Sequence, residues 1–176
     1  MYRQNIRQPS RTDRDRSGGF TLIELLVAVL IIGLLSTVAI ASVQNAVRRA
    51  RVSAVAAEGK VLLQAFATHY VDVGKYPNAS STPNFQLDTF EPLRSMGYYR
   101  GDVASKLVGN RADSYDSPDD TGSNREFWLL MTPEGVPGVQ VVVGHSKAAP
   151  FAGGEWIDGV YIIQNGVLIP ADEYRP

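Results

Sequence analysis

A long apolar segment that holds a single carboxylate limits what this chain can fold into more than any other feature. Residues 20–43 contain one charged side chain, Glu24. As a helix that rises about 1.5 Å per residue, the segment is roughly 36 Å long, which is enough to cross a hydrocarbon core of about 30 Å. A carboxylate near the middle of a bilayer costs on the order of 2.5–3.5 kcal/mol. We therefore expect a membrane-spanning helix in which Glu24 has a partner.

The charges on the two sides of this segment differ in sign. Residues 1–19 carry five Arg against two Asp, a net charge of +3, and residues 52–176 carry nine Lys and Arg against fifteen Asp and Glu, a net charge of −6. Short positive flanks usually stay in the cytoplasm, so we expect residues 1–19 inside and the acidic body outside. Arg48, Arg49 and Arg51 favour the opposite orientation, but the first flank usually dominates.

Two classes of chemistry are excluded by composition. The sequence contains no cysteine, so the fold uses no disulfide and no cysteine-ligated metal. A body this acidic is also unsuited to general nucleic-acid binding, and we expect no nucleic-acid partner.

A secretory signal peptide is the alternative for the first 43 residues. Such a peptide has an apolar stretch of about 7–15 residues followed by a small-residue cleavage site. Here the apolar segment is longer, and the small residues Ser17, Gly18 and Gly19 precede it. Cleavage at this point leaves the helix attached to the mature chain.

The residues around Gly19 form a specific motif. The stretch Gly-Phe-Thr-Leu-Ile-Glu-Leu at residues 19–25, followed by the apolar helix, resembles the start of a type IV prepilin or a type II secretion pseudopilin. The resemblance implies that a prepilin peptidase cuts between Gly19 and Phe20 and N-methylates Phe20. It also implies that Glu24 of one subunit pairs with the Phe20 amine of a neighbour in a filament. The alternative is an ordinary anchor whose Glu24 reaches the lipid headgroups.

The helix is expected to continue beyond the membrane. From Val43 the composition becomes amphipathic, and no break precedes Gly74, a suitable terminating residue before Pro77. Gly59 interrupts the amphipathic part at a cost of about 1 kcal/mol relative to Ala. The predicted buried stripe consists of Val55, Leu62, Phe66 and Tyr70, with Val52 and Val61–Leu63 beside it.

Two details refine the resemblance. Asp-x-Gly-x-Tyr-Pro at residues 72–77 is similar to the stretch that closes the long helix in major pseudopilins, although their Asp-Pro-Trp-Gly element is missing. Many relatives have a proline where this chain has Ala41, so no proline kink is expected there.

The remainder of the chain indicates a small antiparallel sheet. Residues 78–126 are rich in Ser, Asn, Asp, Gly and Pro and are expected to form a long connection with one short helix around residues 90–97. Residues 127–131 and 139–143 have the composition of strands. Residues 160–164 and 167–169 flank Asn165-Gly166, the preferred pair for a type I′ hairpin turn.

Together these segments predict a pilin-like α+β fold, in which one long N-terminal helix packs on a C-terminal sheet of three or four strands. The expected divisions are a removed leader (1–19), a transmembrane and filament-core helix (20–43), its amphipathic continuation (44–74) and a small soluble head (75–176).

Other candidate sites are few. Asp113, Asp116, Asp119 and Asp120 form an oxygen-rich loop that would suit calcium, and a solvated acidic loop is the alternative. His69 is expected on the long helix and His145 in a loop, both without a carboxylate partner and in packing or surface roles. Serine-nucleophile, phosphate-loop and zinc motifs are absent from the sequence. We expect Trp128, Trp156 and Tyr161 to belong to the core.

Three functions compete. The resemblance favours a subunit of the periplasmic pseudopilus of a type II secretion system, which is anchored in the bacterial inner membrane with its N-terminus in the cytoplasm. Its partners would be copies of itself, other pseudopilins, prepilin peptidase, membrane lipid, and an inner-membrane platform with its ATPase. The first alternative is a type IV pilus pilin for adhesion, twitching or DNA uptake. The second is a membrane-anchored enzyme, against which the missing catalytic motifs count.

Overall fold

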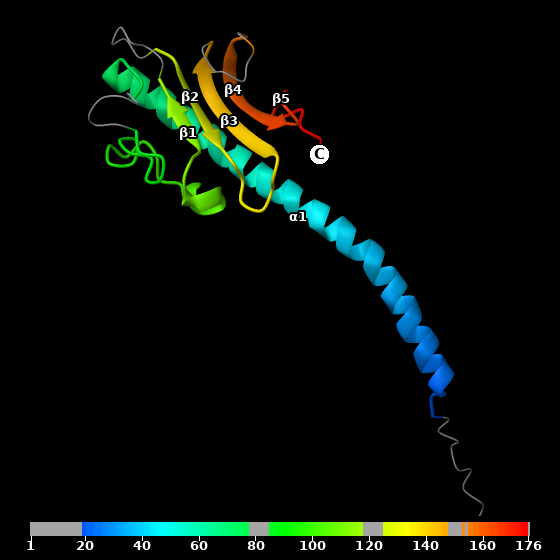
Figure 1. Cartoon of the computed structure of the whole chain (residues 1–176). Coiled ribbons are helices and arrows are strands. Elements are labelled where there is room, and N and C mark those ends of the chain that lie inside the picture. Colours follow the sequence, from blue (N-terminus) through cyan, green and yellow to red (C-terminus); the bar gives the residue numbers. More distant parts are fainter. Residues whose placement is uncertain (1–18, 78–84, 118–124, 148–152, 154, 176) are drawn as a thin grey trace, which may run out of the picture. The chain divides into compact units, whose positions relative to one another are not determined.

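The computed structural model describes residues 19–77, 85–117, 125–147, 153 and 155–175 (Figure 1). The chain has two compact units that meet between Ser42 and Val43, and the long helix runs through this boundary. The elements in chain order are α1 (Leu22–Val73), the 3₁₀ helices η1 (Ala104–Lys106) and η2 (Val108–Asn110), and the strands β1 (Ser114–Asp116), β2 (Phe127–Met131), β3 (Val139–Ser146), β4 (Ile157–Gln164) and β5 (Val167–Pro170).

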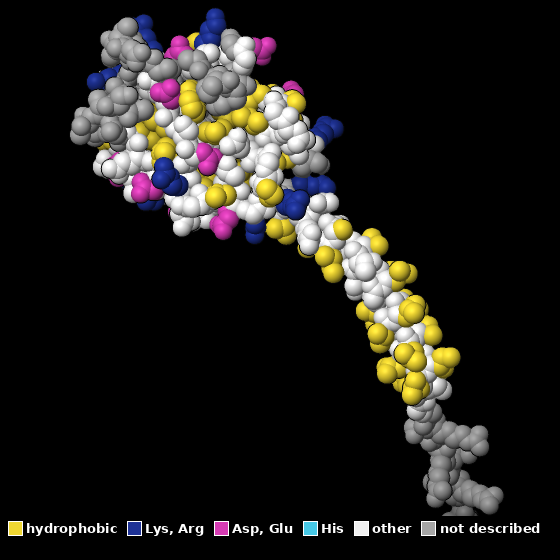
Figure 2. Space-filling model, in the orientation of Figure 1, with side chains coloured by type: hydrophobic (Ala, Val, Ile, Leu, Met, Phe, Trp, Pro, Cys, Tyr) yellow, Lys and Arg dark blue, Asp and Glu magenta, His cyan; other side chains and the backbone are white. Residues whose placement is uncertain are grey.

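The part of α1 in the first unit buries none of its side chains. Its Leu, Ile and Val side chains cover the helix surface that Figure 2 shows. By length and composition α1 can cross a membrane, and its most apolar window has a mean hydropathy of 2.7. The predicted apolar helix is therefore confirmed.

The second unit is a five-stranded antiparallel sheet packed on the second half of α1. The strands are ordered β1-β2-β3-β4-β5, as they occur in the chain, and every neighbouring pair is antiparallel. The turn between β4 and β5 is formed by Asn165 and Gly166, whose φ angles of 53° and 78° are the positive values that a type I′ turn requires. The pilin-like α+β fold is confirmed, with one strand more than the largest number expected.

Gly59 marks a close approach of α1 to the sheet. A Cβ atom placed on Gly59 would lie 2.9 Å from Cγ2 of Val143 on β3 and 3.3 Å from Cγ1 of Val160 on β4. Interiors are close-packed, so a larger side chain here has to displace these valine side chains. The glycine that looked like a flaw in the amphipathic stripe is thus a packing requirement of the fold.

Most residues of the stripe predicted to be buried on α1 are buried in the structure. Val52, Val55, Leu62 and Phe66 are buried, while Tyr70 is half-buried. Val61 is 49% exposed and was wrongly placed beside the stripe. The other side chains that α1 buries are those of Ala56, Ala65 and His69.

Aromatic rings fill the space between α1 and the sheet. The Phe66 ring lies 4.1 Å from that of Phe127 on β2 and 5.6 Å from that of Tyr115 on β1, stacked on both, with Tyr76 and Phe85 around them. Each ring of this kind removes a large apolar area from water. This cluster therefore holds β1 and β2 on the helix.

The connection after α1 differs from the expectation. The predicted short helix around residues 90–97 is wrong, because this stretch forms consecutive turns. Phe90 has a φ of 58°, which lies outside the right-handed helical region and prevents a helix from starting there. The 3₁₀ helices η1 and η2 and the short strand β1 were not expected.

The strand predictions were correct in place but short in length. β2 has the predicted bounds, whereas β3 extends three residues further, to Ser146, and β4 begins earlier, at Ile157. The extensions contain Gly144, His145 and Gly159, whose types do not favour strands, and pairing between β3 and β4 carries them.

The three aromatic residues assigned to the core have different positions. Trp128 is buried on the face of the sheet opposite α1, where it packs with Val142 and Ile157. Tyr161 is half-buried against this cluster. Trp156 was wrongly assigned, since it is 48% exposed.

Candidate functional site

The start of α1 is closed by a reciprocal contact between Thr21 and Glu24. Thr21 Oγ1 accepts the backbone N–H of Glu24 at 3.3 Å, and Glu24 Oε2 accepts the Thr21 backbone N–H and hydroxyl, both at 2.9 Å. This Thr-x-x-Glu arrangement is a capping box, which satisfies N–H groups that the first turn of a helix leaves unpaired. The capping box was not among the sequence-based predictions, although a Thr three residues before a Glu at the start of an apolar run is the usual signal for one.

The cap satisfies hydrogen bonds but leaves the negative charge of Glu24 in place. Within the described residues no Lys, Arg or His forms an ion pair with this carboxylate. Its neighbours along one side of α1 are Ile23, Val27, Ala28 and Ile31. A carboxylate among apolar side chains is stabilised strongly by a cation at short range. The described part of the chain does not supply that cation.

Gly19 and Phe20 precede the helix in an open position. The Phe20 side chain is 89% exposed, and a Cβ atom on Gly19 would meet nothing within 4 Å. Neither residue is part of a helix or strand. The peptide bond between them is therefore accessible to a protease that needs an extended backbone.

The polar side chains inside the apolar part of α1 bond to their own helix. Ser36 Oγ donates to the carbonyl of Ile32 at 2.7 Å, and Thr37 Oγ1 donates to the carbonyl of Leu34 at 2.7 Å. These hydroxyls do not need water, as a membrane requires. A Cβ atom on Gly33 would meet nothing, so this position offers a close approach to another helix.

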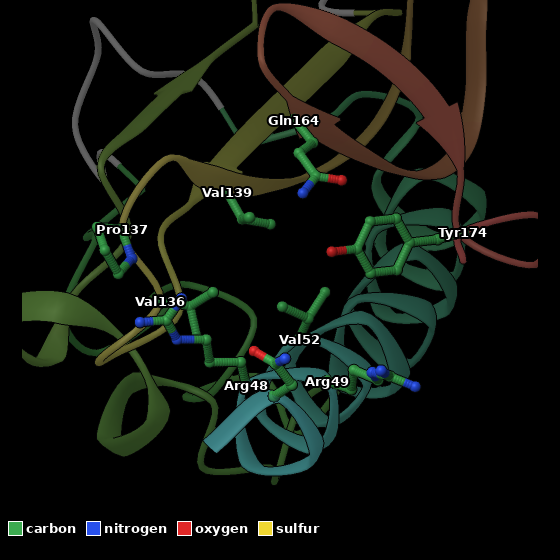
Figure 3. A pocket seen from close by; sticks show the side chains of 9 residues that line it. Arg48, Arg49, Val52, Val136, Pro137, Val139, Gln164 and Tyr174 are labelled. Carbon is green, nitrogen blue, oxygen red and sulfur yellow. The ribbon is translucent and has the colours of Figure 1, made fainter. Parts of the chain in front are cut away.

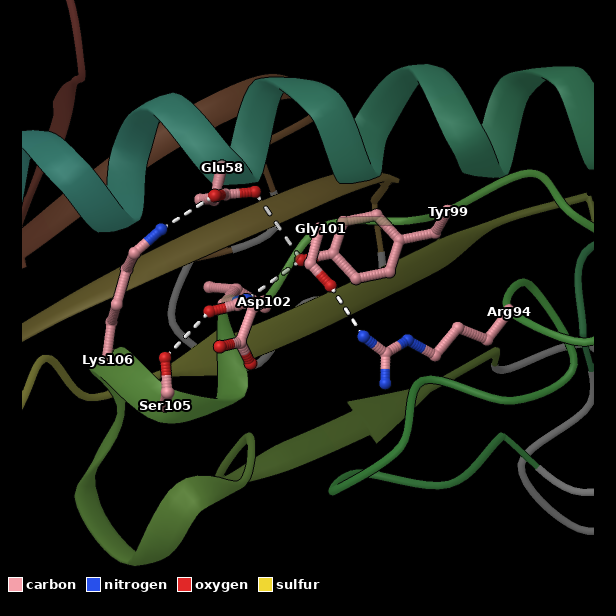
Figure 4. Close-up of polar contacts among 8 residues, drawn as sticks. Glu58, Arg94, Tyr99, Gly101, Asp102, Ser105 and Lys106 are labelled. Carbon is pink, nitrogen blue, oxygen red and sulfur yellow. Dashed lines mark hydrogen bonds and ion pairs between the residues drawn. The ribbon is translucent and has the colours of Figure 1, made fainter.

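A polar network ties the connection after α1 to the helix (Figure 4). Lys106 Nζ lies 2.7 Å from Glu58 Oε1, and the Tyr99 hydroxyl donates to Glu58 Oε2 at 3.4 Å. The same hydroxyl oxygen accepts the backbone N–H of Val103 at 3.0 Å. Burial raises the pKa of Tyr99 to about 12, so the phenol keeps its proton. The network has a structural role, since it holds the connection against α1, and it contains no nucleophile beside a base.

The four aspartates are only partly within the described residues. Asp113 Oδ2 accepts the Thr132 hydroxyl at 2.6 Å, and Asp116 lies on β1 opposite Trp128. Asp119 and Asp120 lie outside the described residues, so the calcium site remains a prediction. In the part of the chain that is described, no three His, Asp or Glu side chains gather closely enough to hold a metal.

The two histidines occupy different environments. His69 is buried, and its Nδ1 lies 3.0 Å from the carbonyl oxygen of Lys75. Burial lowers the pKa of His69, and the Lys75 carbonyl and the charge of Asp72 oppose this shift. The packing role expected for His69 fits this position.

His145 departs from the expectation in two ways. It lies on β3 rather than in a loop, and its Nδ1 is 3.0 Å from Asp158 Oδ1 on β4, a carboxylate partner that the sequence did not reveal. Pairing of β3 with β4 places these two residues opposite each other. The contact is exposed and has no nucleophile in it.

Comparison with known families gave one match. Residues 14–40 match the prokaryotic N-terminal methylation motif, which is typical of type IV pilins and pseudopilins. The match covers the candidate cleavage site, the capping box and most of the apolar part of α1. No curated protein and no solved structure gave a significant match to this chain.

The motif and the fold lead to the same conclusion. A long apolar N-terminal helix on an antiparallel sheet is the pilin-like architecture, and the methylation motif implies processing by prepilin peptidase. The chain therefore combines the N-terminal methylation motif of prepilins with a pilin-like α+β fold.

Proposed function

We propose that this prepilin is cleaved between Gly19 and Phe20, N-methylated on Phe20 and assembled into the periplasmic pseudopilus of a type II secretion system. One observation carries the assembly: the first half of α1 is apolar over residues 22–43 and buries nothing in its own chain. Large exposed apolar surfaces of this kind mark membrane or protein contacts. A membrane covers the surface before assembly, and helices of other subunits cover it afterwards.

The charge of Glu24 forms the proposed contact between subunits. Cleavage creates an α-amino group on Phe20 that is mostly protonated at neutral pH, given a reference pKa near 7.7–8.0. Methylation keeps its positive charge. The Glu24 carboxylate of an incoming subunit then pairs with the Phe20 amine of a subunit already in the filament. Two charges that are costly alone in lipid neutralise each other at this contact.

The proposed location follows from the charges on either side of the membrane segment. The positive leader of residues 1–19 remains in the cytoplasm, and the acidic head is in the periplasm. Growth of the filament requires an inner-membrane platform and a cytoplasmic ATPase, because the exposed face of residues 22–43 must leave lipid for a helical bundle. Copies of the chain and other pseudopilins are the further partners.

The likeness of the Asp-x-Gly-x-Tyr-Pro stretch to that of major pseudopilins is what favours a pseudopilin over a pilus subunit in this proposal. The Gly74 N–H donates to the Tyr70 carbonyl at 2.8 Å and closes the helix, and Tyr76 and Pro77 are buried beyond it. The Tyr76 ring lies 4.5 Å from that of Phe127 in the aromatic core. The Asp-x-Gly-x-Tyr-Pro stretch thus anchors the helix end in the head, which gives a physical reason for its likeness to the stretch in major pseudopilins.

The processing step is tested on the protein isolated from its cells. We expect mass spectrometry to find a chain that begins at methylated Phe20. Substitution of the residue before the cut, Gly19→Val, should leave the uncleaved chain in the membrane, whereas Gly33→Val, inside the helix, should be processed normally. A functional protein that retains residues 1–19 would contradict the proposal.

The secretion role is tested by deleting the gene and restoring it. We expect the deletion to stop export of folded periplasmic proteins into the medium and to leave surface pili and twitching unchanged. The wild-type gene should restore export, and a gene for Glu24→Val should not. Loss of pili or of DNA uptake, with export intact, would instead assign the chain to a type IV pilus.

A further inference from the structure

A pocket lies beside α1 just after the membrane segment in the chain (Figure 3). It has a volume of about 300 Å³ and belongs entirely to the unit that begins at Val43. Its apolar floor is formed by Val52 on α1, Val136 in the β2–β3 connection and Val139 on β3, all of them buried. The floor can cover the carbon atoms of a ligand, and the polar rim decides which ligand fits.

The rim of the pocket carries two exposed cations. Arg48 and Arg49 are exposed, and neither forms a hydrogen bond or an ion pair with any other described residue. Arg51, by contrast, donates to the Glu134 carbonyl at 3.0 Å. In Figure 3 Arg48 and Arg49 extend from α1 toward different sides of the pocket. The positive charge at this place is therefore available to an anionic ligand.

Three uncharged polar side chains, those of Asn45, Gln164 and Tyr174, complete the rim. The Tyr174 hydroxyl points into the pocket, and the amide of Gln164, at the end of β4, faces the same space (Figure 3). They can donate to or accept from hydroxyl groups of a ligand. The pocket thus combines two guanidinium groups, three neutral hydrogen-bonding groups and an apolar floor.

We propose that this pocket binds the phosphodiester headgroup of an anionic phospholipid in the membrane leaflet that faces the head. Guanidinium groups bind phosphate oxygens through pairs of charge-assisted hydrogen bonds. Tyr174 and Gln164 suit the hydroxyl groups of a glycerol headgroup, and the valine floor covers its carbon atoms. The inference rests on the proposed insertion of residues 20–43 into the membrane.

The position along α1 matches the depth of a headgroup. Arg48 follows Val43 by five residues, which is about 7.5 Å of helix. The polar layer of a bilayer adds roughly 5–7 Å on each side of its hydrocarbon core. When Val43 lies at the edge of the core, the backbone of Arg48 and Arg49 is therefore at the outer edge of this layer, and their long side chains can reach back to the lipid phosphates.

This role also accounts for cations on the unexpected side of the membrane. Positive residues close to a membrane segment usually stay in the cytoplasm, yet Arg48 and Arg49 follow the segment and flank the outward head. An acidic head is repelled by an anionic lipid surface, and cations at its base offset that repulsion. The phosphate contact gives the unassembled subunit a second attachment to the membrane and is released when the subunit leaves the lipid.

The test uses the full-length chain in zwitterionic detergent, with lipid binding measured by native mass spectrometry. We expect dioleoylphosphatidylglycerol to bind at least about tenfold more tightly than dioleoylphosphatidylcholine. The double variant Arg48→Gln/Arg49→Gln should weaken phosphatidylglycerol binding by about 25-fold, because a cation near an anionic lipid surface contributes roughly fivefold. The matched control Arg100→Gln/Arg111→Gln removes two exposed cations elsewhere on the head and should leave binding unchanged.

Other arms of the test separate the sources of the anion. Inorganic phosphate at about 10 mM should not displace the lipid, and Tyr174→Phe, which keeps the fold and both cations, should weaken binding a few-fold. Equal binding of the two lipids, wild-type affinity in the arginine variant, or displacement by inorganic phosphate would overturn the proposal. Wild-type lipid binding combined with lost filament assembly in the arginine variant would also overturn it, since the arginines would then act between subunits. Binding to the unassembled chain is measured without filaments, so failure of the secretion role would leave this result intact.

Discussion

The two halves of α1 share one backbone and differ in what covers them. In the first half Leu30 is 71% exposed and Leu34 is 68% exposed, whereas in the second half Val55 and Leu62 are fully buried. The second half finds its partner in the sheet that follows it in the chain. The first half has no partner among the described residues of its own chain. One helix can therefore be folding core in one half and assembly surface in the other. Folding of the chain buries the apolar side chains of the second half only.

The same contrast holds for one carboxylate in each half. Glu58 in the second half lies 2.7 Å from Lys106, a cation of its own chain. Glu24 in the first half has hydrogen bonds from Thr21 but no cation in the described residues. Removing one partner of a pair buried in lipid costs about 3–5 kcal/mol, whereas a partly exposed pair such as Glu58–Lys106 contributes about 1 kcal/mol or less. Loss of the Glu24 carboxylate should therefore impair assembly, whereas loss of the Glu58 carboxylate should lower the folding stability of the head.

The largest expected effect comes from Glu24→Val. Membrane insertion should be unchanged or improved, because a charge is removed from lipid, while incorporation into filaments should fall more than a hundredfold for lack of the counterion to Phe20. Sheared-filament yield and membrane fractionation measure the two outcomes. The control Glu155→Val removes an exposed acid of the head and should assemble normally. Normal assembly of Glu24→Val would remove the charge-pairing account.

Truncation in the covered half should produce the largest loss of folding stability. Phe66→Ala empties a fully buried position at the centre of the aromatic core and should destabilise the head by about 3–5 kcal/mol. Leu34→Ala removes an exposed apolar side chain from the uncovered half and should leave the head's unfolding unchanged. Urea unfolding of the full-length chain in detergent, followed by near-UV circular dichroism, measures both. Equal losses would mean that the two halves are not covered differently.

Two glycines sharpen the comparison at a smaller scale. Gly59→Leu forces a side chain into Val143 and Val160 and should cost about 2–3 kcal/mol of head stability. Gly33→Leu meets nothing within the chain and should not change unfolding of the head. It should instead reduce filament yield, if small residues let neighbouring helices approach. The same urea and filament assays apply, and a stable Gly59→Leu head would show that the helix and sheet are not in close contact.

The two halves could be predicted from the sequence because each carries a local signal. The run of Leu, Ile and Val from residue 22 needs no partner to be recognised, and the spacing of Val55, Leu62 and Phe66 marks one helical face. The hairpin at Asn165-Gly166 was equally local, since the turn type selects the residue pair. The motif at Gly19, Phe20 and Glu24 was readable for the same reason, because all its parts lie within six residues.

What the sequence did not predict depends on contacts between distant residues. The role of Gly59 is set by Val143 and Val160, which lie more than eighty residues away, so propensity alone made it look unfavourable. The contact of His145 with Asp158 exists only because β3 and β4 pair in one register. The pocket at Arg48 and Arg49 requires β3, β4 and the C-terminal Tyr174 to meet α1.

The smallest expected effect concerns pH and His69. Burial lowers the pKa of His69 in the folded head, where its Nδ1 is 3.0 Å from the Lys75 carbonyl and its ring stands edge-on to that of Tyr98. The unfolded chain then binds a proton at His69 more readily than the folded one. The contribution of His69 to the free energy of unfolding is therefore constant well above pH 6.5 and falls as the pH drops below it. The hydrogen bond with the Lys75 carbonyl and the charge of Asp72 oppose the shift, which keeps the effect small.

This pH dependence is measured in a His145→Gln background, which leaves His69 as the only histidine of the chain. Urea unfolding at about pH 7.5 and about pH 5.5 should show a loss of stability that is smaller when His69 is replaced by Leu. The carboxylates of the head titrate in both proteins, so the difference between the two slopes isolates His69. A steeper loss in His69→Leu would mean that the folded head stabilises the protonated ring, and that the end of α1 is less well covered than Val55 and Leu62.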